Sequence, residues 1–222
     1  MQLVHGGDWA GYRAEFGRDP LDFSANVSPL GLPEGVARAI TAALPTADRY
    51  PDPLCRTLRA ALSRAEGVPQ EHILCGNGAA DLIFRLVWAA KPRTALLPAP
   101  TFAEYEQALV SVGCEISRYY LKEENDFCIQ KDYPDVLKRE KPDIIFLCNP
   151  NNPTGITIPQ DLLEEILETC AMQGIFMVVD ECFLDFVKDP EKHTLKGKLE
   201  KYPRLFILKA FTKRYAIPGV RL

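Results

Sequence analysis

The sequence lacks a long hydrophobic run, a paired-cysteine motif and an excess of charge of either sign. Its longest apolar stretches fall far short of the roughly 18 residues needed to cross a membrane, so no membrane-spanning helix is expected. With 26 Lys and Arg against 30 Asp and Glu, the net charge of −4 gives no reason to expect nucleic acid or an anionic membrane as partner. The first residues, MQLVHGGDWAGY, do not show the pattern of a secretion signal.

The cysteines are scattered and form no C-x-x-C motif. There are seven of them in 222 residues, and none is spaced with a histidine as a zinc site requires. The sequence therefore predicts neither a disulfide framework nor a metal site. Free thiols in a cytoplasmic protein are the expectation.

Helical and strand patterns alternate over most of the chain. The first fifty residues look irregular, because glycine and proline interrupt any periodicity. After them, amphipathic helical patterns alternate with short apolar runs. Runs of this kind between such helices predict a mostly parallel sheet covered on both faces, an α/β fold of three α/β/α layers. We expect strands at 73–75, 95–97, 115–121, 144–147, 175–179 and 205–208, with helices between them.

In such sheets ligands bind at the carboxyl ends of the strands, so the polar residues there are the candidates for a site. Small residues, GNGAAD, follow the first expected strand and open a helix at 76–81. The backbone N–H groups of a helix N-terminus form a phosphate site. Taken alone, the same residues more often form an ordinary strand-to-helix turn, because they are not a full nucleotide-binding fingerprint.

Two further strand ends carry polar residues. After 144–147 comes CNPNNPTG, in which two Asn-Pro pairs and a Thr-Gly predict a shaped loop. After 175–179 comes Asp180, where a buried carboxylate needs a cationic partner. A protonated pyridine nitrogen is such a cation. A helix N-cap or a magnesium ligand are alternative roles for Asp180.

The final segment, KAFTKRYAIPGVRL, places Lys213 shortly after the last apolar strand, with Arg221 eight residues later. A lysine in this position is a candidate Schiff-base nucleophile, and the arginine is a candidate phosphate clamp. Together they suggest pyridoxal phosphate (PLP), which carries an aldehyde and a phosphate on one ring. Taken alone, such a lysine more often lies on the surface.

The order NPNNPTG, VVDE, then Lys with Arg eight residues on resembles the fold-type I PLP-dependent enzymes, the aspartate aminotransferase superfamily. Within it the chain resembles the branch of histidinol-phosphate aminotransferases and threonine-phosphate decarboxylases. Segments that are similar to the decarboxylases are HGG at 5–7, DFSAN at 22–26, RYPD at 49–52, FAEY at 102–105 and YAIPG at 215–219. The resemblance implies a cytoplasmic homodimer with shared sites. It also implies an N-terminal arm, 1–50, that contributes to the site and the dimer, and a PLP-binding large domain, 51–222.

The resemblance also implies roles for individual residues. Lys213 would bind the cofactor and later shuttle the proton, and Asp180 would pair with the pyridine nitrogen. The cofactor would further be held by Asn152 at its phenolic oxygen, Phe102 on its ring face, and Gly78, Ala79, Ala80, Thr212, Arg221 and a neighbouring subunit's Tyr50 at its phosphate. His5 and Asn26 would lie near the substrate's own phosphate.

Three positions depart from the pattern that the resemblance implies. Ala210 stands where many relatives carry a serine that bonds the cofactor phosphate, and Thr212 would compensate in part. Phe183 stands where many of the aminotransferases carry a tyrosine, although the decarboxylase branch shows the same substitution. Asp8 stands where an asparagine is expected.

The implied reaction is decarboxylation of L-threonine O-3-phosphate to (R)-1-aminopropan-2-yl phosphate, a step of cobalamin biosynthesis. The alternative within the family is a histidinol-phosphate aminotransferase. An alternative of another class is an inactive fragment that at most binds PLP, because relatives continue beyond the Lys-Arg segment with more sheet and a small C-terminal domain. That domain is expected to be absent from this chain.

Overall fold

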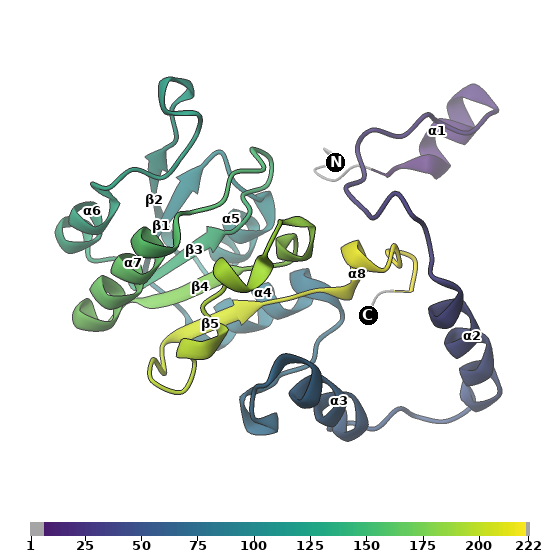
Figure 1. The fold of residues 1–222 in the computed structure, drawn as a ribbon. Coiled ribbons are helices and arrows are strands. Elements are labelled where there is room, and N and C mark those ends of the chain that lie inside the picture. The colour runs from purple at the N-terminus through teal and green to yellow at the C-terminus, as the bar shows by residue number, and fades with distance from the viewer. Residues whose placement is uncertain (1–6, 221–222) are drawn as a thin grey trace.

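Five parallel strands lie side by side in the order β2, β1, β3, β4, β5 and form the centre of the molecule (Figure 1). The computed structural model describes residues 7–220 of the chain. All neighbouring strands are paired in parallel, so the carboxyl ends of the strands lie at one edge of the sheet. The strands are β1 (Thr94–Ala99), β2 (Glu115–Tyr120), β3 (Ile144–Cys148), β4 (Phe176–Asp180) and β5 (Leu205–Leu208).

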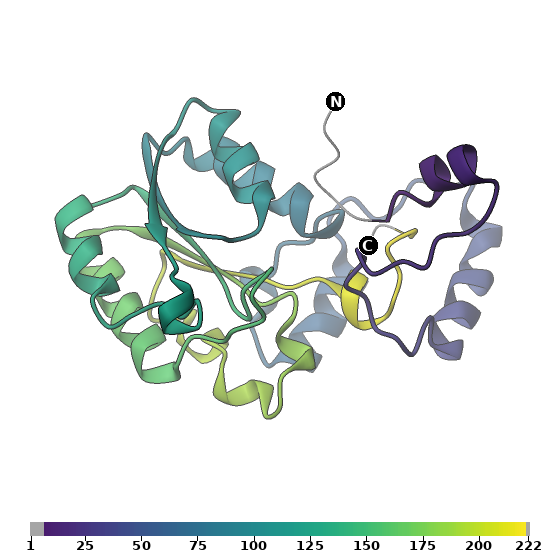
Figure 2. The same ribbon diagram turned by 90° about the horizontal axis from the view of Figure 1, so that it is seen from above.

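Helices cover both faces of this sheet (Figures 1 and 2). On one face lie α6 (Tyr133–Glu140) and α7 (Gln160–Gln173), and on the other lie α4 (Gly78–Ala90) and α5 (Ala103–Val110). The predicted three-layer α/β/α fold is therefore confirmed.

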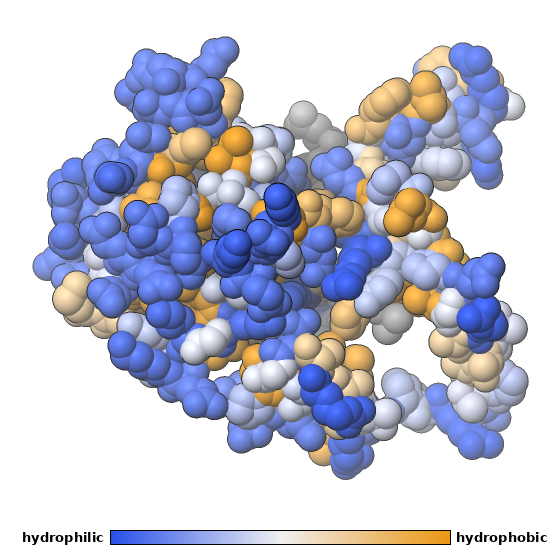
Figure 3. All heavy atoms as spheres, viewed as in Figure 1, coloured by the Kyte–Doolittle hydropathy of each residue, from blue (hydrophilic) through white to orange (hydrophobic). Residues whose placement is uncertain are grey.

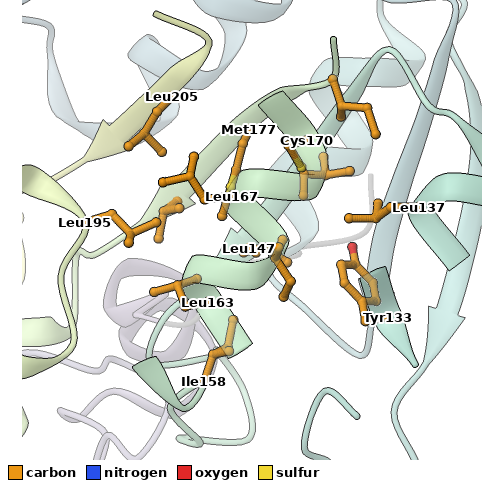
Figure 4. Close-up of a cluster of buried hydrophobic side chains, with 14 of the residues drawn as sticks. Tyr133, Leu137, Leu147, Ile158, Leu163, Leu167, Cys170, Met177, Leu195 and Leu205 are labelled. Atoms are coloured by element: carbon orange, nitrogen blue, oxygen red, sulfur yellow. The ribbon is translucent and has the colours of Figure 1, made fainter. Parts of the chain in front are cut away.

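The central strand β3 shows why the sequence is apolar at every strand position. Ile145 and Leu147 pack toward α6 and α7, whereas Ile144 and Phe146 pack toward α4 and α5. Because neither face meets water, no polar alternation is needed. Figure 4 shows the cluster on the first face, where the predicted stripe of α7 is buried throughout: Leu162, Leu163, Ile166, Leu167 and Cys170.

The N-terminal segment, residues 7–75, has no comparable core. Its helices α1 (Trp9–Phe16), α2 (Glu34–Ala43) and α3 (Arg56–Glu66) bury none of their own residues. In Figures 1 and 2, α1 and α2 lie apart from the sheet, and Figure 3 shows hydrophobic residues on the surface of this segment. Leu30, for example, is 93% exposed.

Most predicted elements are confirmed, but two expectations were wrong. The first fifty residues are not irregular: α1 is capped by Asp8, whose carboxylate accepts from the Gly11 N–H at 3.0 Å, and it ends at Gly17. The breaking residues thus bound these helices and do not prevent them. The run 73–75 is not a strand, because it lies outside the sheet and pairs with none of the strands in residues 7–220.

The remaining elements are one short helix and several 3₁₀ turns. The helix α8 (Phe211–Arg214) follows β5. Within residues 7–220, no helix is long and apolar enough to span a membrane. The 3₁₀ turns are η1 (Leu44–Thr46), η2 (Gln70–His72), η3 (Glu123–Asn125), η4 (Leu184–Phe186), η5 (Pro190–Lys192) and η6 (Lys196–Lys198).

Candidate active site

Asp180 is the last residue of β4 and is only 4% exposed. Two hydrogen bonds hold its carboxylate: the Tyr105 hydroxyl donates to Oδ2 at 2.7 Å, and the Cys182 backbone N–H donates to Oδ1 at 2.9 Å. A carboxylate oxygen accepts up to two hydrogen bonds, so each Asp180 oxygen keeps capacity for one more. The carboxylate is therefore fixed in orientation and still able to accept from a ligand.

Two thiols beside Asp180 stay protonated. Burial, followed by the charge of Asp180, raises the pKa of the Cys148 thiol to about 12. The same two causes raise the pKa of Cys182 well above its usual value, although the nearby Lys213 lowers it. Thiols that remain protonated add no negative charge beside the carboxylate.

Lys213 leaves the sheet from the strand next to Asp180. It lies in α8, directly after β5, and β5 pairs with β4 so that Leu208 stands opposite Asp180. The Lys213 Nζ is 5.7 Å from the centroid of the Phe183 ring, which follows β4. The predicted nucleophile and the predicted ring partner thus stand at the same edge of the sheet, with an aromatic side chain beside the amine.

The N-terminus of α4 offers an anion site. Gly78 opens this helix with φ +80°, and a Cβ added there would meet nothing within 4 Å. The Asn77 side chain makes no capping hydrogen bond, and the Asn77 N–H donates to Asp81 Oδ2 at 2.9 Å. The first N–H groups of an α-helix have no partner inside the helix, so those of Gly78, Ala79 and Ala80 are suited to bind a phosphate.

The loop after β3 is held by its own asparagines. The Asn149 side chain accepts from the Ile158 N–H at 2.9 Å and donates to the His193 carbonyl at 3.1 Å. The Asn151 amide donates to the Pro100 carbonyl at 3.1 Å, which ties this loop to the one that carries Phe102. Asn152 lies half-buried in the turn that these bonds fix.

Phe102 precedes α5, and its ring meets the Tyr105 ring edge-on at 5.5 Å between centroids. Tyr105 itself was not among the residues to which the sequence assigned a role. The available signal was its spacing, because residues three apart on a helix share a face and Tyr105 follows Phe102 by three. The structure adds it to the site through its contact with Asp180.

The N-terminal segment reaches the site at one point. The Ser28 N–H donates to the Lys213 carbonyl at 2.9 Å, which brings the stretch containing Asn26 next to α8. Thr212 lies half-buried in the same helix. Tyr50, in contrast, is fully exposed and is not brought to the other residues. His5 and Arg221 lie outside the described residues.

A separate cleft of about 650 Å³ lies between β2 and α6. Its cationic side chains already have acidic partners: Arg118 is 2.6 Å from Glu106, and Lys122 is 3.3 Å from Glu124. No group of three His, Cys, Asp or Glu side chains suited to a metal ion occurs within residues 7–220. The arrangement at the strand ends remains the better candidate.

The described residues at the strand ends fit pyridoxal phosphate. A buried carboxylate with acceptor capacity suits a protonated ring nitrogen, and the uncapped N-terminus of α4 suits the phosphate. Lys213 provides an amine at the same edge. The model of the family "Aminotransferase class I and II" matches residues 18–222. The chain belongs to this family.

Individual relatives agree with the family. The chain is 40% identical to a threonine-phosphate decarboxylase of Salmonella typhimurium over 99% of its length, and 33% identical to a histidinol-phosphate aminotransferase of Desulfitobacterium hafniense over 92%. A solved histidinol-phosphate aminotransferase from Clostridium acetobutylicum superimposes with a TM-score of 0.81, at 30% identity over 91% of the chain. The chain spans 60%, 56% and 59% of these three proteins.

Proposed function

We propose that this chain carries the cofactor half of a PLP-dependent enzyme that decarboxylates L-threonine O-3-phosphate to (R)-1-aminopropan-2-yl phosphate. The observation that supports this most is the 40% identity to a threonine-phosphate decarboxylase over 99% of the chain. The site is made by residues 51–222, the PLP-binding domain, and residues 1–50 form an arm that completes it.

Each cofactor contact is assigned to a residue of the strand-end edge. Asp180 accepts from the ring nitrogen, Asn152 donates to the phenolic oxygen and Phe102 covers the ring face. The phosphate lies at the N-terminus of α4, bound by the N–H groups of Gly78, Ala79 and Ala80 and by Thr212 and Arg221. Asn26 and His5 bind the phosphate of the substrate.

When bound, pyridoxal phosphate supplies an aldehyde that reacts with amines and a protonated ring that withdraws electrons from the substrate's α-carbon. Asp180 keeps that ring nitrogen protonated. Lys213 provides the amine that holds the cofactor between turnovers. The Lys213 Nζ would also carry a proton to the α-carbon of the substrate.

A histidinol-phosphate aminotransferase is the second candidate, favoured by the TM-score of 0.81 to a solved enzyme of that name. In that reaction Lys213 would remove the proton from the α-carbon, and no carbon dioxide would be released. The two candidates differ in which bond to the α-carbon breaks, and this depends on how the substrate is placed. The residues that place the substrate therefore decide the reaction, while the cofactor contacts serve both.

The enzyme is further proposed to be a cytoplasmic homodimer in which Tyr50 of one subunit binds the cofactor phosphate of the other. Full exposure of the Tyr50 ring supports a partner surface at this residue. All seven cysteines are free, which agrees with a reducing compartment. A Tyr50→Phe variant should keep the dimer and weaken PLP binding, which equilibrium dialysis measures.

The test of the proposed reaction supplies PLP and compares two substrates. Release of carbon dioxide from threonine phosphate, without glutamate from histidinol phosphate and 2-oxoglutarate, supports the decarboxylase. Glutamate formation instead supports the aminotransferase. A protein that binds PLP and converts neither substrate would support the third possibility, a piece that binds the cofactor without turnover.

A further inference from the structure

Tyr105 is a buried polar side chain to which the proposed function gives no role. It lies on α5, is 0% exposed, and donates its hydroxyl proton to the Asp180 Oδ2 at 2.7 Å. Donor and acceptor are 75 residues apart in the sequence: Tyr105 lies on α5, which connects β1 and β2, whereas Asp180 ends β4. A hydrogen bond to a charged acceptor is among the stronger ones in a protein interior.

The ring of Tyr105 is locked in place by two aromatic contacts. It stacks on Phe146 of β3 with centroids 4.8 Å apart and an interplanar angle of 16°. It also meets the Phe102 ring at 5.5 Å and 80°. One side chain thus contacts both Phe102, assigned to the cofactor's ring face, and Asp180, assigned to the ring nitrogen.

The hydroxyl also stays a proton donor under all ordinary conditions. Burial, followed by the negative charge of Asp180, raises the pKa of Tyr105 well above its usual value of 10. A tyrosine that does not ionise can only present its O–H to the carboxylate. The Tyr105 hydroxyl is therefore a neutral proton donor to the Asp180 carboxylate.

We propose that Tyr105 is a positioning residue that orients the Asp180 carboxylate toward the cofactor's ring nitrogen and couples this carboxylate to Phe102. The inference rests on the proposed function, because it takes Asp180 as the partner of that nitrogen. The proposed cofactor contacts do not include Tyr105. Its effect is exerted through Asp180, whose second oxygen is held by the Cys182 N–H at 2.9 Å.

The chain offers a matched control in Tyr133. This tyrosine is also 0% exposed, but it lies on the other face of the sheet, and its hydroxyl is buried without a hydrogen-bond partner among the described residues. Tyr105→Phe and Tyr133→Phe therefore remove the same atom from equally buried rings. Only the first removes a bond to Asp180.

The test is a double-mutant cycle on PLP affinity, read by fluorescence titration of the protein with PLP. Loss of a charge-assisted hydrogen bond should raise the dissociation constant of PLP about 10-fold in Tyr105→Phe. Tyr133→Phe should stay within about 2-fold of the wild type, because it loses no bond. In an Asp180→Asn background, Tyr105→Phe should cause no further loss. The pH midpoint of the bound cofactor's visible absorption should shift in Tyr105→Phe and not in Tyr133→Phe.

The outcomes separate this inference from the proposed function. If Asp180→Asn weakens PLP binding while Tyr105→Phe leaves both affinity and absorption midpoint unchanged, the role of Tyr105 is wrong and the site assignment stands. Equal PLP binding by wild type and Asp180→Asn, or none by either, overturns both. If the Phe variant is too unstable to titrate, the same cycle is measured on the unfolding midpoint of the cofactor-free protein. Additive effects of the two substitutions there would contradict the coupling.

Discussion

The sheet region, residues 94–208, and the N-terminal segment, residues 7–75, differ in how they are stabilised. Every residue of β3 is buried, and helices close both faces of the sheet. In the N-terminal segment no helix residue is buried, and large apolar side chains such as Phe23 and Leu30 are exposed. Most of the predicted cofactor contacts lie in or next to the self-contained sheet region. Asn26 and Tyr50 lie in the segment that lacks its own core.

This contrast indicates that the proposed site has two parts, one for the cofactor and one for the substrate and the partner subunit. The residues proposed to contact the cofactor are held in place, since Asp180 and the loop after β3 are hydrogen-bonded from several sides. The residues assigned to substrate and partner lie on a surface whose apolar side chains need another surface to cover them. Each prediction below tests one side of this comparison.

The largest effect is expected at Lys213, the amine proposed to hold the cofactor, which lies in α8 just after the sheet region. Lys213→Ala should abolish the borohydride-reducible adduct with PLP, because no other residue is assigned to form it. Mass spectrometry of the reduced protein measures this. Lys209→Ala is the matched control, since Lys209 directly follows β5 and is paired with Glu66 at 3.0 Å. An adduct of undiminished yield in Lys213→Ala would refute the assignment.

Identical substitutions in the two regions should differ in their effect on stability. Leu163→Ala removes a fully buried side chain of α7 and should cost about 2–5 kcal/mol of unfolding free energy. Leu30→Ala removes one that is 93% exposed and should stay within about 0.5 kcal/mol. Urea unfolding measures both. A large cost at Leu30 would mean that the N-terminal segment packs on another surface in solution. The difference in burial between the two regions would then hold for the single chain and not for the protein in solution.

The sheet region should also respond to pH through Glu181, which is 2% exposed and accepts hydrogen bonds from the Thr194 hydroxyl at 2.9 and 2.8 Å. Burial raises its pKa from 4.5 to about 7. Between these values the folded protein holds a proton that the unfolded chain has lost, so this group's contribution to stability falls as pH rises and is gone above about 7. The whole effect is at most about 3 kcal/mol.

Glu181→Gln should therefore flatten the pH dependence of the unfolding free energy across this window. Thermal or urea unfolding at a series of pH values measures the change in slope. Glu164→Gln is the control. The hydrogen bond with Lys198 lowers the pKa of Glu164, so this carboxyl does not titrate between 4.5 and about 7. An unchanged slope in Glu181→Gln would show that the carboxyl is ionised in the folded protein.

The smallest effect is expected where the two regions are joined. Glu66 of α3 lies 3.0 Å from Lys209 and 3.7 Å from Lys196, at the boundary with the sheet region. Partly exposed ion pairs contribute little, so Glu66→Gln should cost about 0.5 kcal/mol and speed hydrogen exchange in α3. Glu34→Gln, which loses a pair within α2, should leave α3 unchanged. Unaltered exchange in Glu66→Gln would show that the ion pairs do not hold α3.

How far the sequence predicts the fold depends on the region. The runs 144–147 and 205–208 and the stripe of α7 were found because burial on both faces leaves an unbroken apolar signal. In the N-terminal segment, α1 and α2 were missed because we expected the glycine and proline residues around them to interrupt any periodicity, although these residues flank the two helices. The run 73–75 has the composition of a strand, but a strand must also pair with a neighbouring strand. The sequence of the run does not show whether such a neighbour exists.

For the site, the sequence by itself determined the chemical groups: an amine at Lys213, a carboxylate at Asp180, an aromatic ring at Phe102 and a small-residue helix start at Gly78. Their order along the chain also indicated the family. Only the tertiary structure decided which groups meet. The Tyr105 ring of α5 stacks on Phe146 of β3, and β3 is paired with β4, so the Tyr105 hydroxyl reaches Asp180 at the end of β4. Strand order is set by the packing of the whole sheet, and no local pattern in the sequence encodes it.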